Sequence, residues 1–207
     1  MKLLTPRRVT YAVKALSEDP ILGPIIAQYP KPEFQMSNCV FASLSGAIIS
    51  QQLSTKASAT IYGRFLKLIR KRKPDAKAVS KCTVEQLRGV GVSRQKASYL
   101  LDLANKTLDG ELHIDRLAEM PNDEVIAEIT NVKGLGEWSA DMFLMFALCR
   151  PDVWPVGDLG IRNGVRDLLG QEERLPIDEL HEVAEAWRPY RTVAARYVWD
   201  SLDNKPL

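Results

Sequence analysis

A short polar stretch in the middle of the chain combines flexible backbone with a charged side chain. Residues 130–141 read TNVKGLGEWSAD, so Gly134 and Gly136 flank one leucine and follow Lys133. Glycine lets the backbone adopt positive φ and approach a ligand closely. A helix starting at Glu137 would point its unpaired N–H groups out of this turn, which favours binding of an anion such as a DNA phosphate. The alternative is an ordinary turn between helices that needs glycine only to change direction.

The second candidate for chemistry is Asp158, within the stretch VWPVGDLGI at residues 153–161. A carboxylate can stabilise positive charge that develops during a reaction, and it can orient or deprotonate an attacking water. The alternative is a simple N-cap of the following helix. The two roles are compatible, because a helix N-terminus keeps a carboxylate ionised at neutral pH.

The elements that must position these residues are helices. Apolar residues recur with helical spacing, and no convincing alternating strand pattern appears. Ser37 and Ser54 are expected to cap two successive helices, the first of which runs into Gln51-Gln52. The sequence therefore predicts an all-α fold. Further helices are predicted at 7–17, 20–29, 94–108, 122–130, 137–149, 159–169, 178–187 and 190–202.

Composition limits the class of protein. A chain of 207 residues with 45% hydrophobic and 26% charged residues is typical of a soluble globular protein, and it can bury one core or two small lobes that share a cleft. The longest apolar run, Met142–Cys149, is too short to span a bilayer, and the N-terminus does not resemble a signal peptide. Cys39, Cys82 and Cys149 lie far apart and are expected to be reduced. We expect a monomer without membrane association, located in the cytoplasm or nucleoid, or in the nucleus of a eukaryote.

Charge is distributed unevenly along the chain. Residues 56–96 contain twelve Lys or Arg and two Asp or Glu, whereas residues 97–160 contain four basic and twelve acidic residues. Such asymmetry indicates that one face binds a polyanion. The alternative is that the basic run at 70–73 is only a solvated helix end.

Four stretches together resemble one known family. VKGLGEWSA at 132–140 resembles the helix-hairpin-helix of DNA base-excision glycosylases, and residues 153–161 resemble the Gly/Pro-rich loop and aspartate that complete the helix-hairpin-helix-GPD superfamily. IISQQLSTKA at 48–57 and WRPYRTVAARYVW at 187–199 are similar to its alkylpurine branch, the 3-methyladenine DNA glycosylase II type. The resemblance implies two helical lobes around a cleft. One lobe would comprise 1–36 plus 150–207, and the other 37–149, with the helix-hairpin-helix at about 122–149.

The resemblance implies a monofunctional DNA glycosylase in base excision repair, acting by base flipping and hydrolysis assisted by Asp158. Bifunctional members carry a catalytic lysine where this chain has Trp138, so no lyase activity is expected. His113 and His181 are isolated, and no general acid is evident. A purine alkylated at N3 or N7 is already cationic and leaves without one, so 3-methyladenine and 7-methylguanine are the expected substrates. The alternatives are a glycosylase for another lesion, such as 8-oxoguanine or hypoxanthine, and a non-catalytic DNA-binding module.

The resemblance also implies roles for particular residues. Trp138 would form a wall of the base pocket and attract a cationic purine, although it could instead be a core residue beside Phe143. The stretch at 51–53 would enter the minor groove, although it could be only a polar helix end. No cofactor is required, and the expected partner is double-stranded DNA with alkylated bases. Further candidates for the base pocket are Tyr62, Trp154, Trp187 and Tyr190, and candidates for the wedge are Gln51, Gln52 and Leu53. The candidates for phosphate binding are Lys133, Gly134, Leu135, Gly136, Lys56, Arg94 and Lys96. Backbone carbonyls of Thr130, Val132 and Leu135 could hold Na⁺ or K⁺.

Overall fold

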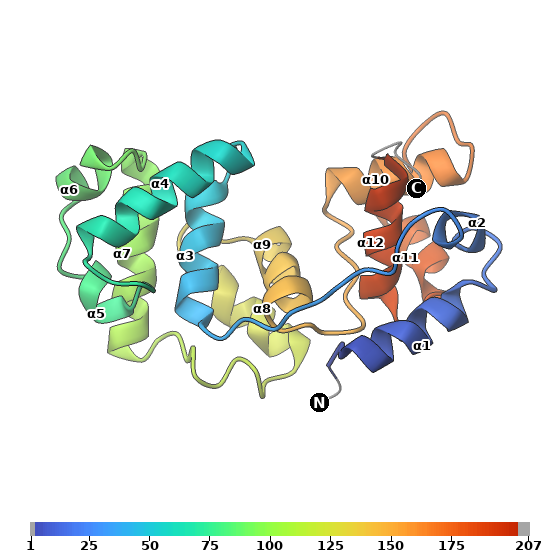
Figure 1. Cartoon of the computed structure of the whole chain (residues 1–207), viewed down its shortest axis with the longest axis horizontal. Helices are drawn as coiled ribbons and strands as arrows, with labels where there is room; N and C mark the ends of the chain where they lie inside the picture. Colours follow the sequence, from blue (N-terminus) through green and yellow to red (C-terminus); the bar gives the residue numbers. More distant parts are fainter. Residues whose placement is uncertain (1–2, 203–207) are drawn as a thin grey trace. The chain divides into compact units, whose positions relative to one another are not determined.

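The computed structural model describes residues 3–202, which fold into two compact units. Unit 1 combines Met1–Met36 with Leu144–Leu207, and unit 2 is Ser37–Phe143. Every regular element in the described part of the chain is helical, which confirms the all-α prediction (Figure 1). The chain passes between units earlier than the expected 149/150 boundary, within a π-helical segment at Phe143–Ala147. None of the helices described at 3–202 combines the length and the apolar character that a membrane span needs.

Unit 2 is organised around its longest helix, α7, which packs against α3, α5 and α6. The side chains of Leu100 and Leu103 on α7 and Phe65 on α4 are completely buried in its core. A separate helix pair, α8 and α9, forms the two arms of the predicted hairpin. The elements of this unit are α3 (Val40–Ser50), α4 (Thr55–Leu68), α5 (Ala76–Val79), α6 (Val84–Gly89), α7 (Arg94–Asp109), α8 (Asn122–Thr130) and α9 (Glu137–Met142).

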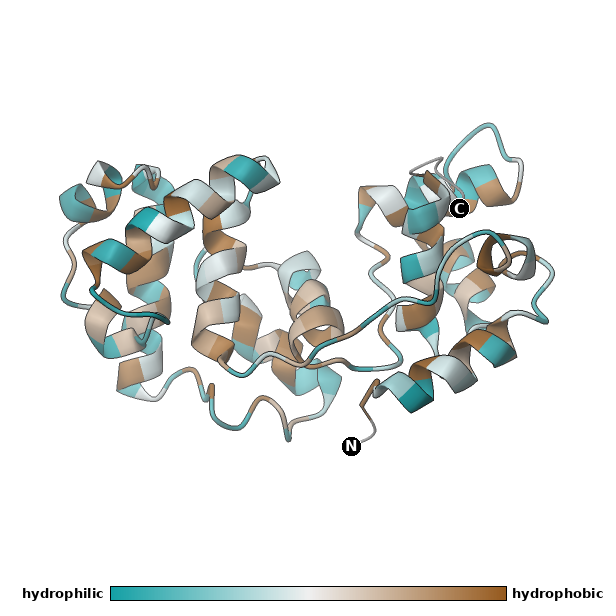
Figure 2. Ribbon diagram, viewed as in Figure 1, coloured by the Kyte–Doolittle hydropathy of each residue, from teal (hydrophilic) through white to brown (hydrophobic). Residues whose placement is uncertain are grey.

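Unit 1 is organised around the C-terminal helix α12, which packs against α10, α1 and α2. Ile161 of α10 and Val198 of α12 are fully buried, and apolar residues occur in both helices (Figure 2). Burying them removes apolar surface from water, which is the main favourable contribution to folding. The elements of this unit are α1 (Pro6–Leu16), α2 (Gly23–Ile26), α10 (Leu159–Leu168), α11 (Ile177–Glu185) and α12 (Arg191–Leu202).

Local capping chemistry explains where several helices begin. The Ser54 hydroxyl accepts a hydrogen bond from the backbone N–H of Ala57, as expected of an N-cap. The predicted cap at Ser37 is wrong: α3 begins after Cys39, and the Ser37 hydroxyl instead accepts from the N–H of Cys39 at 3.2 Å, forming a turn. The helix expected at 20–29 is reduced to α2, and that expected at 137–149 ends as an α-helix at Met142.

One glycine allows the closest approach of helices in unit 1. A Cβ atom added at Gly164 of α10 would lie 2.5 Å from Cγ1 and 3.0 Å from the backbone oxygen of Val198 on α12. Neither neighbour can move easily, because Val198 is fully buried and one of the atoms belongs to the backbone. The spacing between α10 and α12 therefore depends on the absence of a side chain at this position.

We expect Gly164→Ala to lower the free energy of unfolding by about 1–3 kcal/mol, because the added methyl group must push α10 and α12 apart. Thermal unfolding followed by circular dichroism measures the effect. The matched control is Gly63→Ala in α4, where an added Cβ meets nothing within 4 Å. That substitution should be neutral or stabilising, since alanine has the higher helix propensity. Equal effects of the two substitutions would contradict this account of the packing.

Candidate active site and nucleic-acid interface

The Asp158 carboxylate is held in a defined orientation at the start of α10. Its Oδ1 atom accepts hydrogen bonds from the backbone N–H of Ile161 at 2.9 Å and from the indole N–H of Trp199 at 2.8 Å. Asp158 is therefore the N-cap of α10, and it is half-buried rather than turned out into solvent. Two donors from different helices therefore fix the orientation of this one oxygen. The capping role and a role in chemistry thus use the same side chain.

A row of aromatic rings adjoins this carboxylate within unit 1. The ring of Trp199 lies 6.0 Å from that of Phe146, which stacks on Phe34 at 6.3 Å between centroids. Phe146 is 43% exposed, which is unusual for so large an apolar side chain. Trp199, Phe146 and Phe34 were not among the residues predicted from the sequence to form the site. The signal available for Trp199 was its place at the end of the WRPYRTVAARYVW stretch.

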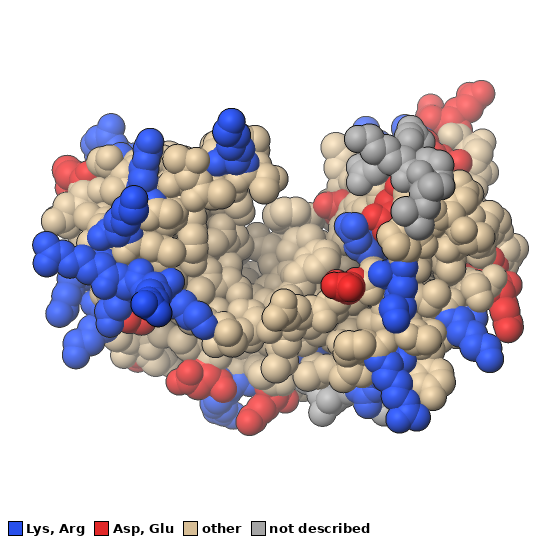
Figure 3. All heavy atoms as spheres, viewed as in Figure 1, with Lys and Arg blue, Asp and Glu red and all other residues tan. Residues whose placement is uncertain are grey.

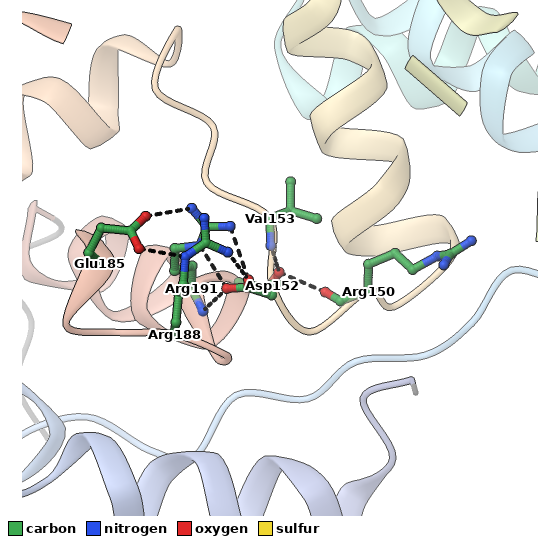
Figure 4. Close-up of polar contacts among 7 residues, drawn as sticks. Arg150, Asp152, Val153, Glu185, Arg188 and Arg191 are labelled. Atoms are coloured by element: carbon green, nitrogen blue, oxygen red, sulfur yellow. Dashed lines mark hydrogen bonds and ion pairs between the residues drawn. The ribbon is translucent and has the colours of Figure 1, made fainter. Parts of the chain in front are cut away.

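The loop that leads to Asp158 is fixed to the beginning of α12 (Figure 4). The Asp152 carboxylate accepts a hydrogen bond from Arg188 at 2.7 Å. It also accepts two hydrogen bonds from Arg191, at 2.7 and 3.0 Å, in a bidentate arrangement. The hydroxyl of Thr192 accepts from the N–H of Val153 at 3.0 Å and donates to the carbonyl of Arg150 at 2.7 Å. These contacts hold residues 150–153 at one end, while Asp158 is held at the other.

Two of the proposed base-pocket tryptophans belong to the core of unit 1. Trp187 is completely buried, and its ring meets that of Trp154 edge-on at 5.2 Å between centroids. The expectation that Trp187 lines the base pocket is therefore wrong, because a pocket wall needs an accessible face. Trp154 is also buried, at 6% exposure, and its ring packs against Trp187. Tyr190 is half-buried and stays a prediction.

The remaining pocket candidates lie in unit 2. Trp138, in the first turn of α9, is 48% exposed, so it is not a core residue of this unit and has a surface available for stacking. Tyr62 of α4 is half-buried beside Phe65, with ring centroids 6.0 Å apart. Burial, together with the nearby Cys39, raises the pKa of the Tyr62 hydroxyl. Both pocket roles stay predictions.

The hairpin between α8 and α9 depends on one glycine conformation. Gly134 has φ of 79°, and a Cβ added there would overlap the ring of Tyr99 on α7 at 2.1 Å. Asp102, also on α7, accepts from the backbone N–H of Lys133 at 2.9 Å and pairs with its ammonium at 3.5 Å. Gly136 is the N-cap of α9 and offers no side chain to its first turn. The hairpin thus presents backbone and a mostly exposed lysine at the surface of unit 2.

The loop between α3 and α4 forms an exposed tip. Gln52 adopts φ of 54°, which is unfavourable for a residue with a side chain, and Leu53 is 39% exposed. Gln51 differs from both, because its side-chain amide donates to the carbonyl of Gly134 at 2.8 Å. Gln51 therefore joins the tip to the hairpin, and Gln52 and Leu53 are the exposed wedge candidates.

Basic side chains gather on the face of unit 2 over α4 and α5 (Figure 3). Lys56 and Arg94 are exposed, in keeping with their predicted contact with phosphates. Lys96 is half-buried, and its ammonium donates to the carbonyls of Ile49 and Gln51 at 2.8 and 2.6 Å. Its contact with phosphate stays a prediction. Burial lowers the pKa of Lys96.

The described residues contain no cluster of His, Cys, Asp and Glu with the geometry of a metal site. The predicted monovalent cation would use backbone carbonyls instead. The carbonyl of Val132 already accepts from the N–H of Leu135 at 3.1 Å, which leaves it one lone pair for an ion. Leu135 and its Gly neighbours keep their predicted place in the hairpin, and the cation itself stays a prediction.

Comparison with known proteins identifies the family. The sequence model for the HhH-GPD superfamily base excision DNA repair protein matches residues 45–189. The chain belongs to this superfamily. The matched range contains the tip at 51–53, the hairpin and Asp158, so the family resemblance inferred from four short stretches is confirmed.

Relatives of known structure agree in fold over almost the whole chain. DNA-3-methyladenine glycosidase from Bacillus halodurans is 31% identical with a TM-score of 0.84, and the match covers 99% of this chain and 94% of that one. The 3-methyladenine DNA glycosylase of Schizosaccharomyces pombe, solved in complex with abasic DNA, is 31% identical with a TM-score of 0.79 and coverage of 93% and 97%. These similarities confirm the helix-hairpin-helix glycosylase fold.

Relatives identified by sequence are also named as DNA-3-methyladenine glycosylases. DNA-3-methyladenine glycosylase 1 of Schizosaccharomyces pombe is 35% identical over 162 residues, which cover 77% of this chain and 71% of the relative. In three of these matches, between 77% and 91% of this chain is aligned. The aligned part covers between 66% and 71% of the length of each relative.

The hairpin glycines provide a matched pair of substitutions. We expect Gly134→Ala to lower the free energy of unfolding by about 1–3 kcal/mol or more. The alanine would have to adopt a left-handed backbone conformation, and its methyl group would overlap the ring of Tyr99. At Gly136 an added Cβ meets nothing within 4 Å and φ is −104°, so Gly136→Ala should leave stability within about 0.5 kcal/mol of wild type. Chemical denaturation measures both. A tolerated alanine at 134 would contradict the described hairpin.

Asp141 gives a prediction on pH. Burial, and secondarily Glu137 one turn earlier on α9, raises the pKa of Asp141 from 3.8 to about 7. The folded state therefore retains a proton that the unfolded chain releases, so this group makes the protein less stable as pH rises from about 4 to about 7. We expect Asp141→Asn to be more stable than wild type by about 1–2 kcal/mol above pH 7, with the difference disappearing toward pH 4. Denaturant titrations across that range measure it, and a difference that does not vary with pH would contradict the assignment.

Proposed function

We propose that this protein is a monofunctional DNA glycosylase that hydrolyses the N-glycosidic bond of alkylated purines in base excision repair. The observation that carries the proposal is the Asp158 carboxylate, fixed by Ile161 and Trp199 within the range that the superfamily model matches. The names of the relatives support it, since those at 31% to 35% identity are 3-methyladenine glycosylases.

The carboxylate acts through electrostatics. As the bond between C1′ and the base lengthens, the deoxyribose acquires oxocarbenium character, and the negative charge of Asp158 stabilises it. The same carboxylate orients the attacking water and accepts its proton once attack is under way. Because the donors to Oδ1 are already in place in the free protein, little reorganisation is needed during the reaction.

We propose that no general acid takes part in the reaction, which limits the substrates. His113 in unit 2 bonds to Glu128 at 2.9 Å, and His181 is exposed on α11 in unit 1. A base that carries a positive charge leaves without protonation, whereas a neutral base leaves slowly. The proposed substrates are therefore 3-methyladenine, 7-methylguanine and similar cationic adducts, and the exposed indole of Trp138 would attract them through a cation–π interaction.

The proposed reaction is hydrolysis without strand cleavage. A lyase reaction at this site would need an amine to form a Schiff base, and residue 138 is tryptophan rather than lysine. The substrate would be double-stranded DNA, with phosphates held by the hairpin and by exposed basic residues such as Lys56 and Arg94. We propose that the protein acts inside the cell as a monomer.

We expect Asp158→Asn to reduce release of 3-methyladenine from a duplex at least about 100-fold, because the amide removes the charge that stabilises the transition state. Affinity for the same duplex should hold or rise. Single-turnover base release and fluorescence anisotropy measure the two quantities. The same assay with 8-oxoguanine and hypoxanthine should give slow or no release.

The matched control is Asp167→Asn at the other end of α10, where the carboxylate pairs with Arg166 at 2.5 Å. This control should retain base release within about twofold of wild type. Full activity of Asp158→Asn would exclude Asp158 as the catalyst. Wild-type protein that binds duplex DNA but releases none of the methylated bases would identify a binding module instead.

A further inference from the structure

The ammonium of Lys96 closes the C-terminal end of α3. Lys96 lies in the first turn of α7, and its Nζ donates to the carbonyls of Ile49 at 2.8 Å and Gln51 at 2.6 Å. Carbonyls in the last turn of a helix have no donor within that helix, and a cation there also interacts favourably with the helix dipole. The next residues in the chain are the exposed tip.

The tip needs such support because its backbone is strained. The chain leaves α3 after Ser50 and enters α4 at Thr55, so the direction changes within a few residues. Gln52 accommodates the change with φ of 54°, a conformation that costs a residue with a side chain about 1 kcal/mol or more. Such conformations persist only where the surrounding structure fixes them, and Lys96 supplies two of the fixing hydrogen bonds.

The tip and the hairpin are held by the same face of one helix. On α7, Lys96 bonds to the end of α3, Tyr99 lies against Gly134, and Asp102 accepts from the N–H of Lys133. Spacings of three residues place these side chains along one side of a helix. The hydrogen bond from Gln51 to the carbonyl of Gly134 joins the tip directly to the hairpin. The distance between the two loops is therefore set within unit 2, before any ligand binds.

We propose that Lys96 is a positioning residue for extrusion of the damaged base. By fixing the end of α3, it keeps the tip at a set distance from the hairpin, so that a duplex anchored by its phosphates at the hairpin meets Gln52 and Leu53 in register. This inference rests on the proposed function, and it assigns Lys96 to the wedge rather than to phosphate binding. Loss of the ammonium would leave the anchor intact and the wedge misplaced.

The test compares two basic residues that lie close together on α7. Lys96→Met removes the ammonium but keeps the aliphatic stem, and Arg94→Met removes an exposed cation that we expect to contact phosphate. Three quantities are measured: affinity for an undamaged duplex as a function of salt, fluorescence of 2-aminopurine beside the lesion as a report on extrusion, and single-turnover release of 3-methyladenine.

For Lys96→Met we expect an unchanged salt slope and affinity for undamaged duplex, with the extrusion signal and base release reduced roughly tenfold or more. Part of the defect should disappear when the lesion is mispaired, because extrusion then costs less. Lys96→Arg, which retains donors and charge, should recover part of the activity. Arg94→Met should instead weaken binding to all duplexes and lower the salt slope by about 1.

A drop in salt slope for Lys96→Met equal to that of Arg94→Met would overturn the proposal, as would normal extrusion by Lys96→Met. If Lys96→Met does not fold, Gln51→Met takes its place, since it breaks only the bond to Gly134 and should also impair extrusion without changing the salt slope. Normal extrusion by that variant would likewise overturn the proposal. Failure of the wild-type protein to release 3-methyladenine would contradict the proposed function, whereas normal wild-type release with unaffected variants would contradict only this inference.

Discussion

One carboxylate oxygen, Oδ1 of Asp158, receives hydrogen bonds from its own helix and from a second helix that begins far later in the chain. Ile161 contributes its backbone N–H and Trp199 its indole N–H. The second bond exists only because α10 and α12 approach closely, and that approach requires the bare backbone of Gly164 against Val198. Packing between two helices thus determines the orientation of the group proposed to carry out the chemistry.

The same helix, α12, holds both ends of the loop that precedes Asp158. Arg191 and Thr192 at its start bond to residues 150–153, and Trp199 near its end bonds to Asp158. In unit 2, α7 has a comparable role, because one of its faces contacts the tip at 51–53 and the hairpin at 133–136. In each unit, loops that would otherwise be mobile are fixed by side chains of a single well-packed helix, which is how a small all-α protein can present preorganised groups.

Much of the fold was predictable because helix periodicity is a local property of the sequence. The helix at 122–130 and the cap at Ser54 were found at their observed positions. The short helices α5 and α6 were missed, since four and six residues contain too few turns to show a period. Ser37 was assigned as a cap because nothing in the sequence distinguishes a capping serine from one that closes a turn.

The candidate site was predictable only in part, for a related reason. Asp158 and the hairpin glycines lie in recognisable stretches, but the partners of Lys96 and Trp199 are remote in the chain and depend on how helices pack. Lys96 lies in a basic segment, so the sequence predicts that it binds phosphate. The structure adds that its ammonium donates to two backbone carbonyls. Likewise, the sequence does not distinguish a buried tryptophan from an accessible one, and only the structure shows that Trp187 is completely buried.

Gly160 lies beside the hydrogen-bonded pair formed by the Asp158 carboxylate and the Trp199 indole. A Cβ at this residue would lie 2.9 Å from Oδ1 of Asp158 and 3.0 Å from Trp199, so no side chain fits there without disturbing that pair. The position beside the proposed catalytic carboxylate therefore cannot accept a side chain without changing that pair. Variants with a different lesion preference would instead change more distant surfaces, such as the exposed rings of Phe146 and Trp138, and keep the arrangement around Asp158.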